Sequence, residues 1–171
     1  MRFDARRWTW AQVVAGVAAL VLLISLFQPW YDIRFTGCPG GACRADNRLG
    51  RLSGIAVHGY LWVTFAAALA VLVLLALRAL DRAAFFQSPD DRQLVAGLAG
   101  LNLIVVLVAF LGKPGFIALP AQGPPAPLPL PLLAVSWQYG AWLAIVAAIV
   151  AAAAGAVNLL RPIPVRHPMR L

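Results

Sequence analysis

Four long apolar runs constrain this chain more than any other feature. None of them contains Asp, Glu, Lys or Arg, and only the second contains a histidine, His58. As a helix rising 1.5 Å per residue, each run can cross the roughly 30 Å hydrocarbon core of a bilayer. The sequence therefore predicts an all-α integral membrane protein, a single four-transmembrane-helix bundle. We expect spans at about 11–27, 55–77, 94–112 and 137–160, outer loops at 28–54 and 113–136, and an inner loop at 78–93.

The composition agrees with a membrane domain and narrows its partners. Hydrophobic residues make up 62% of the 171 residues and charged residues 12%, against about 25% charged residues in soluble domains. The net charge is +8, but the arginines are spread over the segments between the runs instead of forming a basic stripe. We therefore expect anionic lipid headgroups, and no nucleic acid, as the partner of this charge.

The Lys and Arg residues also predict the orientation. Nine lie in the N-terminus, the inner loop and the C-terminus, and five lie in the two outer loops. Because positive residues favour the cytoplasmic side, we expect both termini in the cytoplasm. The richness in Ala, Pro and Arg is typical of a GC-rich bacterial genome, so the expected location is a bacterial inner membrane. Interfacial aromatic rings should mark the span ends, and the candidates are Trp8, Trp10, Trp30, Trp62, Trp137 and Trp142.

Helix boundaries are marked by capping residues and breakers. We expect the first helix to stop at Gln28-Pro29 and the third to end at Gly112. The other expected caps are serines at the starts of the second, third and fourth helices, namely Ser53, Ser88 and Ser136. The proline-rich stretch 114–133 predicts an irregular outer cap with polyproline II character, or else a simple connector.

Cys38 and Cys43 are the only cysteines, and both lie in the first outer loop. The intervening Pro-Gly-Gly-Ala is a turn-forming sequence, so a disulfide in an oxidising exterior would staple a short hairpin. Its arms would be Tyr31–Thr36 and the stretch after Cys43. The alternative is a redox-active pair, but that chemistry needs a second cysteine pair to pass electrons on.

His58 is the one histidine within an apolar run. We expect it to hydrogen-bond to loop backbone near the outer interface and not to bind haem, because the other histidine, His167, lies in the tail on the opposite side. Two thiolates and a distant histidine do not make a zinc site. No catalytic residue, metal or cofactor is predicted.

Asn102 is the strongly polar residue in the middle of the third run. An amide at that depth is expected to hydrogen-bond to a neighbouring helix. Small residues suggest close packing of the third and fourth spans, through Gly97 and Gly100 on one and a stripe on the other that includes Ala144, Ala148 and Ala152.

The exit from the first helix, Phe27, Pro29, Trp30 and Tyr31, and Ser53-Gly54 before the second, resemble uncharacterised four-span membrane proteins of GC-rich bacteria. This resemblance covers the first hairpin and implies no activity.

The packing devices, together with the lack of a catalytic constellation, predict a non-enzymatic accessory or scaffold subunit of a membrane assembly, with a membrane-protein partner or a homo-oligomer. Polar positions such as Ser25, Asn102 and Asn158 leave open a small channel or carrier for an uncharged or lipid-like substrate. The third alternative is an outer-face thiol oxidoreductase that uses Cys38 and Cys43.

Overall fold

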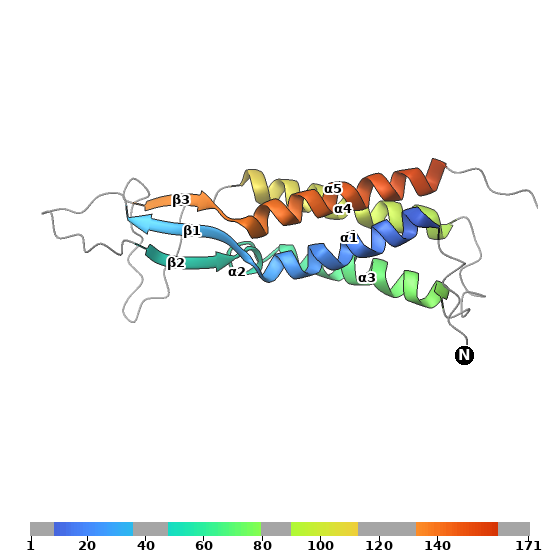
Figure 1. The fold of residues 1–171 in the computed structure, drawn as a ribbon, viewed down its shortest axis with the longest axis horizontal. Coiled ribbons are helices and arrows are strands. Elements are labelled where there is room, and N and C mark those ends of the chain that lie inside the picture. The colour runs from blue at the N-terminus through green and yellow to red at the C-terminus, as the bar shows by residue number, and fades with distance from the viewer. Residues whose placement is uncertain (1–8, 36–47, 80–89, 113–132, 161–171) are drawn as a thin grey trace, which may run out of the picture.

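The computed structural model describes residues 9–35, 48–79, 90–112 and 133–160. Long helices lie side by side and a small sheet extends from one end of them (Figure 1). In these residues the elements follow in the order α1 (Trp10–Phe27), β1 (Pro29–Phe35), β2 (Arg48–Ser53), α2 (Gly54–Val57), α3 (Leu61–Ala79), α4 (Asp90–Leu111), β3 (Leu133–Trp137) and α5 (Tyr139–Leu160).

The four long helices bury small residues and expose large ones. α1 packs against α3 and α5, and α4 packs against the same two helices. The buried faces of α1 and α5 consist largely of alanine, which lets the backbones approach closely. Large side chains instead cover the outer surface, for example Val17 and Ile24 on α1, Ile104 on α4 and Val146 on α5. Apolar surface on this scale suits contact with lipid and not with water.

Three of these helices are long and apolar enough to cross a membrane: α1, the Arg92–Leu111 part of α4, and α5. The apolar part of α3, Leu61–Leu77, is shorter. The described part of the chain is thus mostly helical and has the helices of a membrane protein.

The expectation of a largely helical fold is confirmed, but the fold is not all-α, because the chain also forms a three-stranded antiparallel sheet. β1 is the central strand, with β2 on one side and β3 on the other. The β1–β2 pair gives the predicted hairpin its two arms. Gly50 has φ of 136°, a conformation that side-chain-bearing residues rarely adopt, and it pairs with Ile33 where the register shifts.

The second predicted helix is broken. Ser53 caps its start as expected, accepting from the backbone N–H of Ala56. That cap begins only the single turn of α2, which ends at Val57 with His58 as its C-cap, and a new helix, α3, starts at Leu61. The interruption follows from side-chain contacts of His58 described below, which a run of apolar residues does not reveal.

The fourth predicted helix begins later than Trp137. Residues up to Trp137 pair with β1 through Tyr31↔Trp137 and Asp32↔Ser136, so Ser136 lies in a strand and does not cap the helix. Backbone pairing with β1 therefore extends the strand to the edge of α5, which starts at Tyr139. The strand was missed because Leu133–Trp137 follows a proline-rich stretch.

The remaining helix ends follow the sequence signals. The C-cap of α1 is Gln28, whose N–H donates to the carbonyl of Ser25. α4 ends at Leu111, and the N–H of Gly112 donates to the carbonyl of Val108. Ser88 lies outside the described residues.

Gly54 and Gly59 provide a matched test of how tightly α2 packs against the side chain of Trp30. A Cβ on Gly54 would lie 2.5 Å from Cε2 of Trp30, whereas a Cβ on Gly59 would meet nothing within 4 Å. We expect Gly54→Ala to lower the free energy of unfolding by roughly 1–3 kcal/mol because the buried indole must shift. Gly59→Ala should change it by less than about 0.5 kcal/mol. Thermal unfolding in detergent measures both, and equal losses would contradict this packing.

Candidate functional site

Trp30 anchors the sheet to the end of α1. Its side chain is fully buried, and its indole N–H donates to the carbonyl of Ser25 at 2.8 Å. That carbonyl belongs to the last turn of α1, where it also accepts from the backbone N–H of the C-cap residue Gln28, so the indole uses its second acceptor position. Gly54 lies against the indole ring, so the sheet, α1 and α2 meet at this side chain.

Tyr31, the next residue, links three segments that are far apart in the sequence. Its hydroxyl lies 2.7 Å from Nε2 of His58 and 3.4 Å from the carbonyl oxygen of Ala109 on α4. On the other side of the ring, Nδ1 of His58 lies 3.2 Å from the hydroxyl of Tyr60. Tyr31 and His58 are buried, whereas Tyr60 is 43% exposed. The cluster thus leads from the surface to the buried end of the helices.

The number of protons on the three side chains of this cluster allows one arrangement of donors and acceptors that satisfies every contact. A hydroxyl has a single proton, and a neutral imidazole donates from one nitrogen and accepts at the other. All contacts are satisfied when Tyr60 donates to Nδ1, Nε2–H donates to Tyr31, and Tyr31 donates to the carbonyl of Ala109. The tautomer of His58 is therefore assigned from its partners.

Burial favours the neutral form of every group in the cluster. It lowers the pKa of His58 from its usual value. It also raises the pKa of Tyr31, to which the charge of Tyr60 adds, and raises the pKa of Tyr60 itself. At neutral pH, two phenols and a neutral imidazole are joined by hydrogen bonds, an arrangement that links chain segments distant in sequence.

The start of α5 is held to the same junction. The backbone N–H of Gln138 donates to the carbonyl of Trp30 at 2.8 Å, and the hydroxyl of Tyr139 donates to Oε1 of Gln28 at 2.8 Å. Gly140 completes the contact, since a Cβ there would lie 2.6 Å from the carbonyl oxygen of Pro29. These contacts fix where α5 leaves the sheet.

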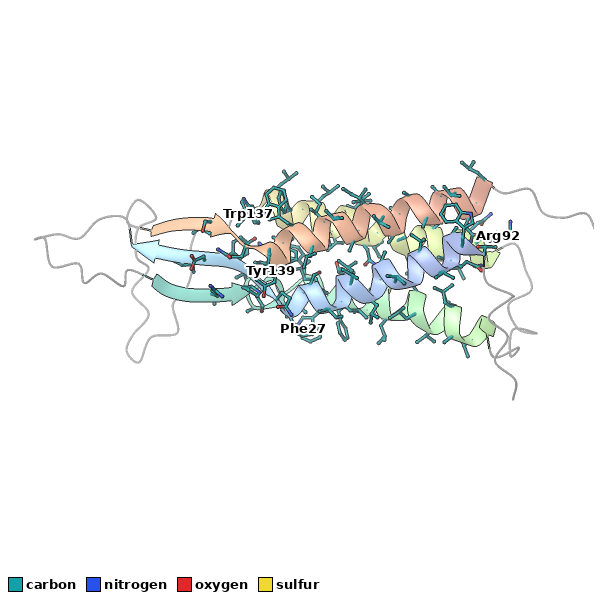
Figure 2. All side chains as sticks on the ribbon, in the orientation of Figure 1. Phe27, Arg92, Trp137 and Tyr139 are labelled. Carbon is teal, nitrogen blue, oxygen red and sulfur yellow. The ribbon has the colours of Figure 1, made fainter. Side chains whose placement is uncertain are left out.

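Stacked aromatic rings surround the junction. Trp137, labelled where the sheet meets the helices in Figure 2, stacks on Phe110 of α4 with ring centroids 4.4 Å apart. Trp137 also lies 5.1 Å from the ring of Tyr31, and Trp142 lies 5.0 Å from the ring of Phe110. The strand β3 is thus packed against α4 as well as paired with β1.

The predicted interfacial tryptophans separate into two groups. Trp10, Trp62 and Trp142 are more than half exposed near helix ends, where an interfacial ring is expected. Trp30, by contrast, is buried, and Trp137 is a half-buried strand residue, so these two hold the sheet in place. Trp8 lies outside the described residues.

The predicted small-residue contact between the third and fourth spans uses other residues. α4 and α5 pack together, but the close approach is made by Gly155, where a Cβ would lie 3.1 Å from Cα of Ala96. Gly97 and Gly100 have no atom within 4 Å of an added Cβ, because they lie on the outer side of α4. In the predicted stripe on α5, Ala144 and Ala148 are buried and Ala152 is partly buried.

Asn102 is buried, at 2% exposure, on the inward face of α4 with Ala99 and Val106. The predicted interhelical hydrogen bond is not found at its Oδ1, which has no hydrogen-bond partner among the described residues. His58 also differs from expectation, because its ring bonds two tyrosine side chains instead of loop backbone. The sequence signal for the tyrosine cluster was slight: Tyr60 is two positions from His58.

Cys38 and Cys43 lie outside the described residues, so their disulfide stays a prediction. Within the segments that the structure describes, no group of three or more His, Cys, Asp or Glu side chains could hold a metal ion.

Comparison with known proteins adds no family assignment. No family model, no curated protein and no solved structure matches this chain. The resemblance to four-span bacterial proteins therefore stays a prediction.

The lowered pKa of His58 predicts a loss of stability in acid. The unfolded chain binds a proton on this histidine near its ordinary pKa of about 6.5, while the folded protein binds it only at lower pH. The stabilisation is therefore complete above about pH 6.5 and falls as the pH drops toward the folded pKa. Thermal midpoints between pH 8 and pH 4.5 should fall more steeply for the wild type than for His58→Gln. His167 is present in both proteins and cancels, so parallel curves would contradict the prediction.

Proposed function

We propose that this protein is a non-enzymatic accessory or scaffold subunit of a membrane assembly. The observation that supports the proposal is on the outer surface of α4, where a Cβ added at Gly97 or Gly100 would meet no atom within 4 Å. A partner helix in the membrane, from another protein or a second copy, is the occupant that suits this surface.

Glycine at these two positions needs a reason. Gly97 is exposed, Gly100 is partly exposed, and neither is needed for contacts within the chain. Each costs about 1 kcal/mol of helix propensity relative to alanine. Membrane helices associate where small residues let backbones approach, since lipid supplies no hydrophobic drive between them. Contacts with a partner that packs over Gly97 and Gly100 would offset this loss of helix propensity.

We also propose that all four long helices cross the bilayer. α3 contains 19 residues, which at 1.5 Å per residue is about 28 Å. It packs along α1 and α4, both of which are long and apolar enough to cross. Its outward face carries Val63, Leu69 and Val73, as a lipid-facing surface requires.

The proposed location is a bacterial inner membrane with both termini in the cytoplasm. The nine-to-five distribution of Lys and Arg supports this orientation. The start of α1 and the end of α5 lie at the same end of the helices, opposite the sheet (Figure 1). In this orientation the sheet extends from the outer surface, while anionic headgroups meet the positive inner segments.

The sheet suits a scaffold because its orientation is fixed. Trp30 and Tyr31 tie its central strand to the helices, and among the described residues no further strand pairs with the two edge strands, β2 and β3. Open strand edges can add a strand from another chain. An assembly could therefore be contacted at two places, in the bilayer by α4 and outside it by the sheet.

A small channel or carrier for an uncharged substrate is the second candidate. It is favoured by buried polar atoms without a partner in the protein, namely Oγ1 of Thr64, Oδ1 of Asn102 and Oδ1 of Asn158. A solute flux into liposomes that Asn102→Leu abolishes would favour this candidate over the scaffold.

Replacing the two glycines tests the scaffold proposal. We expect Gly97→Leu with Gly100→Leu to release the protein from its complex, as a drop in size on native gels of membranes dissolved in mild detergent. The variant should fold at least as stably as the wild type, because leucine has the higher helix propensity and a Cβ at either position meets no atom within 4 Å.

The control is Ala153→Leu, a smaller enlargement at an exposed position of α5. It should leave the complex intact. A wild-type protein that migrates as a monomer, or a glycine variant that stays in the complex, would contradict the proposal.

A further inference from the structure

Two buried polar side chains face the interior from adjacent helices. Thr64 on α3 is fully buried, and Asn102 on α4 is 2% exposed. Among the described residues, Oγ1 of Thr64 and Oδ1 of Asn102 have no hydrogen-bond partner, although α3 and α4 pack together. A buried polar atom that stays unpaired costs free energy, so each needs a partner.

The register of the two helices places these side chains at a similar depth. The hydroxyl of Tyr31 contacts both His58, just before α3, and the carbonyl of Ala109 on α4, so the imidazole and this carbonyl lie close together. Asn102 lies two turns before Ala109, about 10 Å below it at 1.5 Å per residue. Thr64 lies in the first turn of α3, beyond the short break that follows His58. The two side chains therefore agree in depth to within roughly one helical turn.

The other described side chains near this depth do not supply the missing partner. The facing positions of α5 are alanines, Ala147 and Ala148, which have no polar atom in the side chain. On α1, the hydroxyl of Ser25 donates to the carbonyl of Leu22 at 2.7 Å and makes no hydrogen bond with Oγ1 of Thr64 or Oδ1 of Asn102. A small molecule that can both donate and accept is the remaining kind of partner.

We propose that Thr64 and Asn102 bind an interior water molecule between α3 and α4. Oδ1 of an asparagine only accepts, so the water donates to Asn102. The hydroxyl of Thr64 can donate or accept, so it can donate to the oxygen of the same water. Buried waters typically make about three hydrogen bonds to groups that are otherwise unpaired, and these two atoms supply two of them. The water joins the two helices through atoms that make no direct hydrogen bond to any described residue.

Asn158 provides the matched control. It is also a buried amide with an unpaired Oδ1. It lies one turn beyond Gly155, which faces Ala96, so it is near the opposite end of α4 from Ala109. Asn158 therefore cannot share a water with Thr64.

A double-mutant cycle and a structure in lipid test the site together. The variants are Thr64→Val, Asn102→Leu and the double variant, and the control pair is Thr64→Val with Asn158→Leu. Either single change leaves the other atom without its water, whereas the double change removes both polar atoms. The double variant should therefore lose clearly less thermal stability than the sum of its single variants, while the control pair should add.

A crystal structure of the wild-type protein grown from a lipid phase should show water density within hydrogen-bond distance of both Oγ1 of Thr64 and Oδ1 of Asn102. This measurement needs no variant and decides the question if a variant fails to fold. An additive Thr64 and Asn102 pair, a direct hydrogen bond between the two side chains, or a site without water density would each overturn the proposal.

Discussion

The fold depends on how the chain leaves α1. Two consecutive residues, Trp30 and Tyr31, turn the end of that helix into the central strand of a sheet, and both are fully buried. The indole of Trp30 donates to a carbonyl in the last turn of α1, while the hydroxyl of Tyr31 reaches His58 and the carbonyl of Ala109. Three segments that are distant in sequence are thereby brought to one point.

The departures from a simple bundle follow from that junction. The second apolar run is broken because His58 turns toward Tyr31 and Tyr60 instead of continuing a helix. The fourth helix starts late because the residues before it pair with β1 and place Trp137 on Phe110. Apolar composition alone predicts continuous helices at both of these positions.

The sequence predicted what depends on composition and on local signals. Length and the absence of charge located the helices, and Gln28-Pro29 and Gly112 marked two of their ends. Which face of each helix points inward was not predictable in the same way. Both the buried and the lipid-facing positions are mainly apolar, and the two faces differ in the size of their side chains. Gly97 and Gly100 looked like internal contacts, yet only the helix rotation in the structure places them outside.

The candidate site was also only partly predictable. Asn102 was expected in the interior, but Thr64 was missed because threonine is unremarkable in an apolar run. The strand β3 was hidden next to many prolines. Pairings such as Tyr31 with His58 join residues 27 positions apart, and no spacing rule for helices or strands connects them.

Native-state amide hydrogen exchange in lipid nanodiscs is the most direct test that Tyr31 makes the sheet and the helices one unit. In the wild type, the amides of β1 and β3 should open with the same free energy as those of the first turn of α3. Tyr31→Phe leaves His58 without its buried partner, so both groups should lose protection together, by roughly 1–3 kcal/mol. Strand amides that exchange independently, with the helix amides unchanged in the variant, would contradict a single cooperative junction.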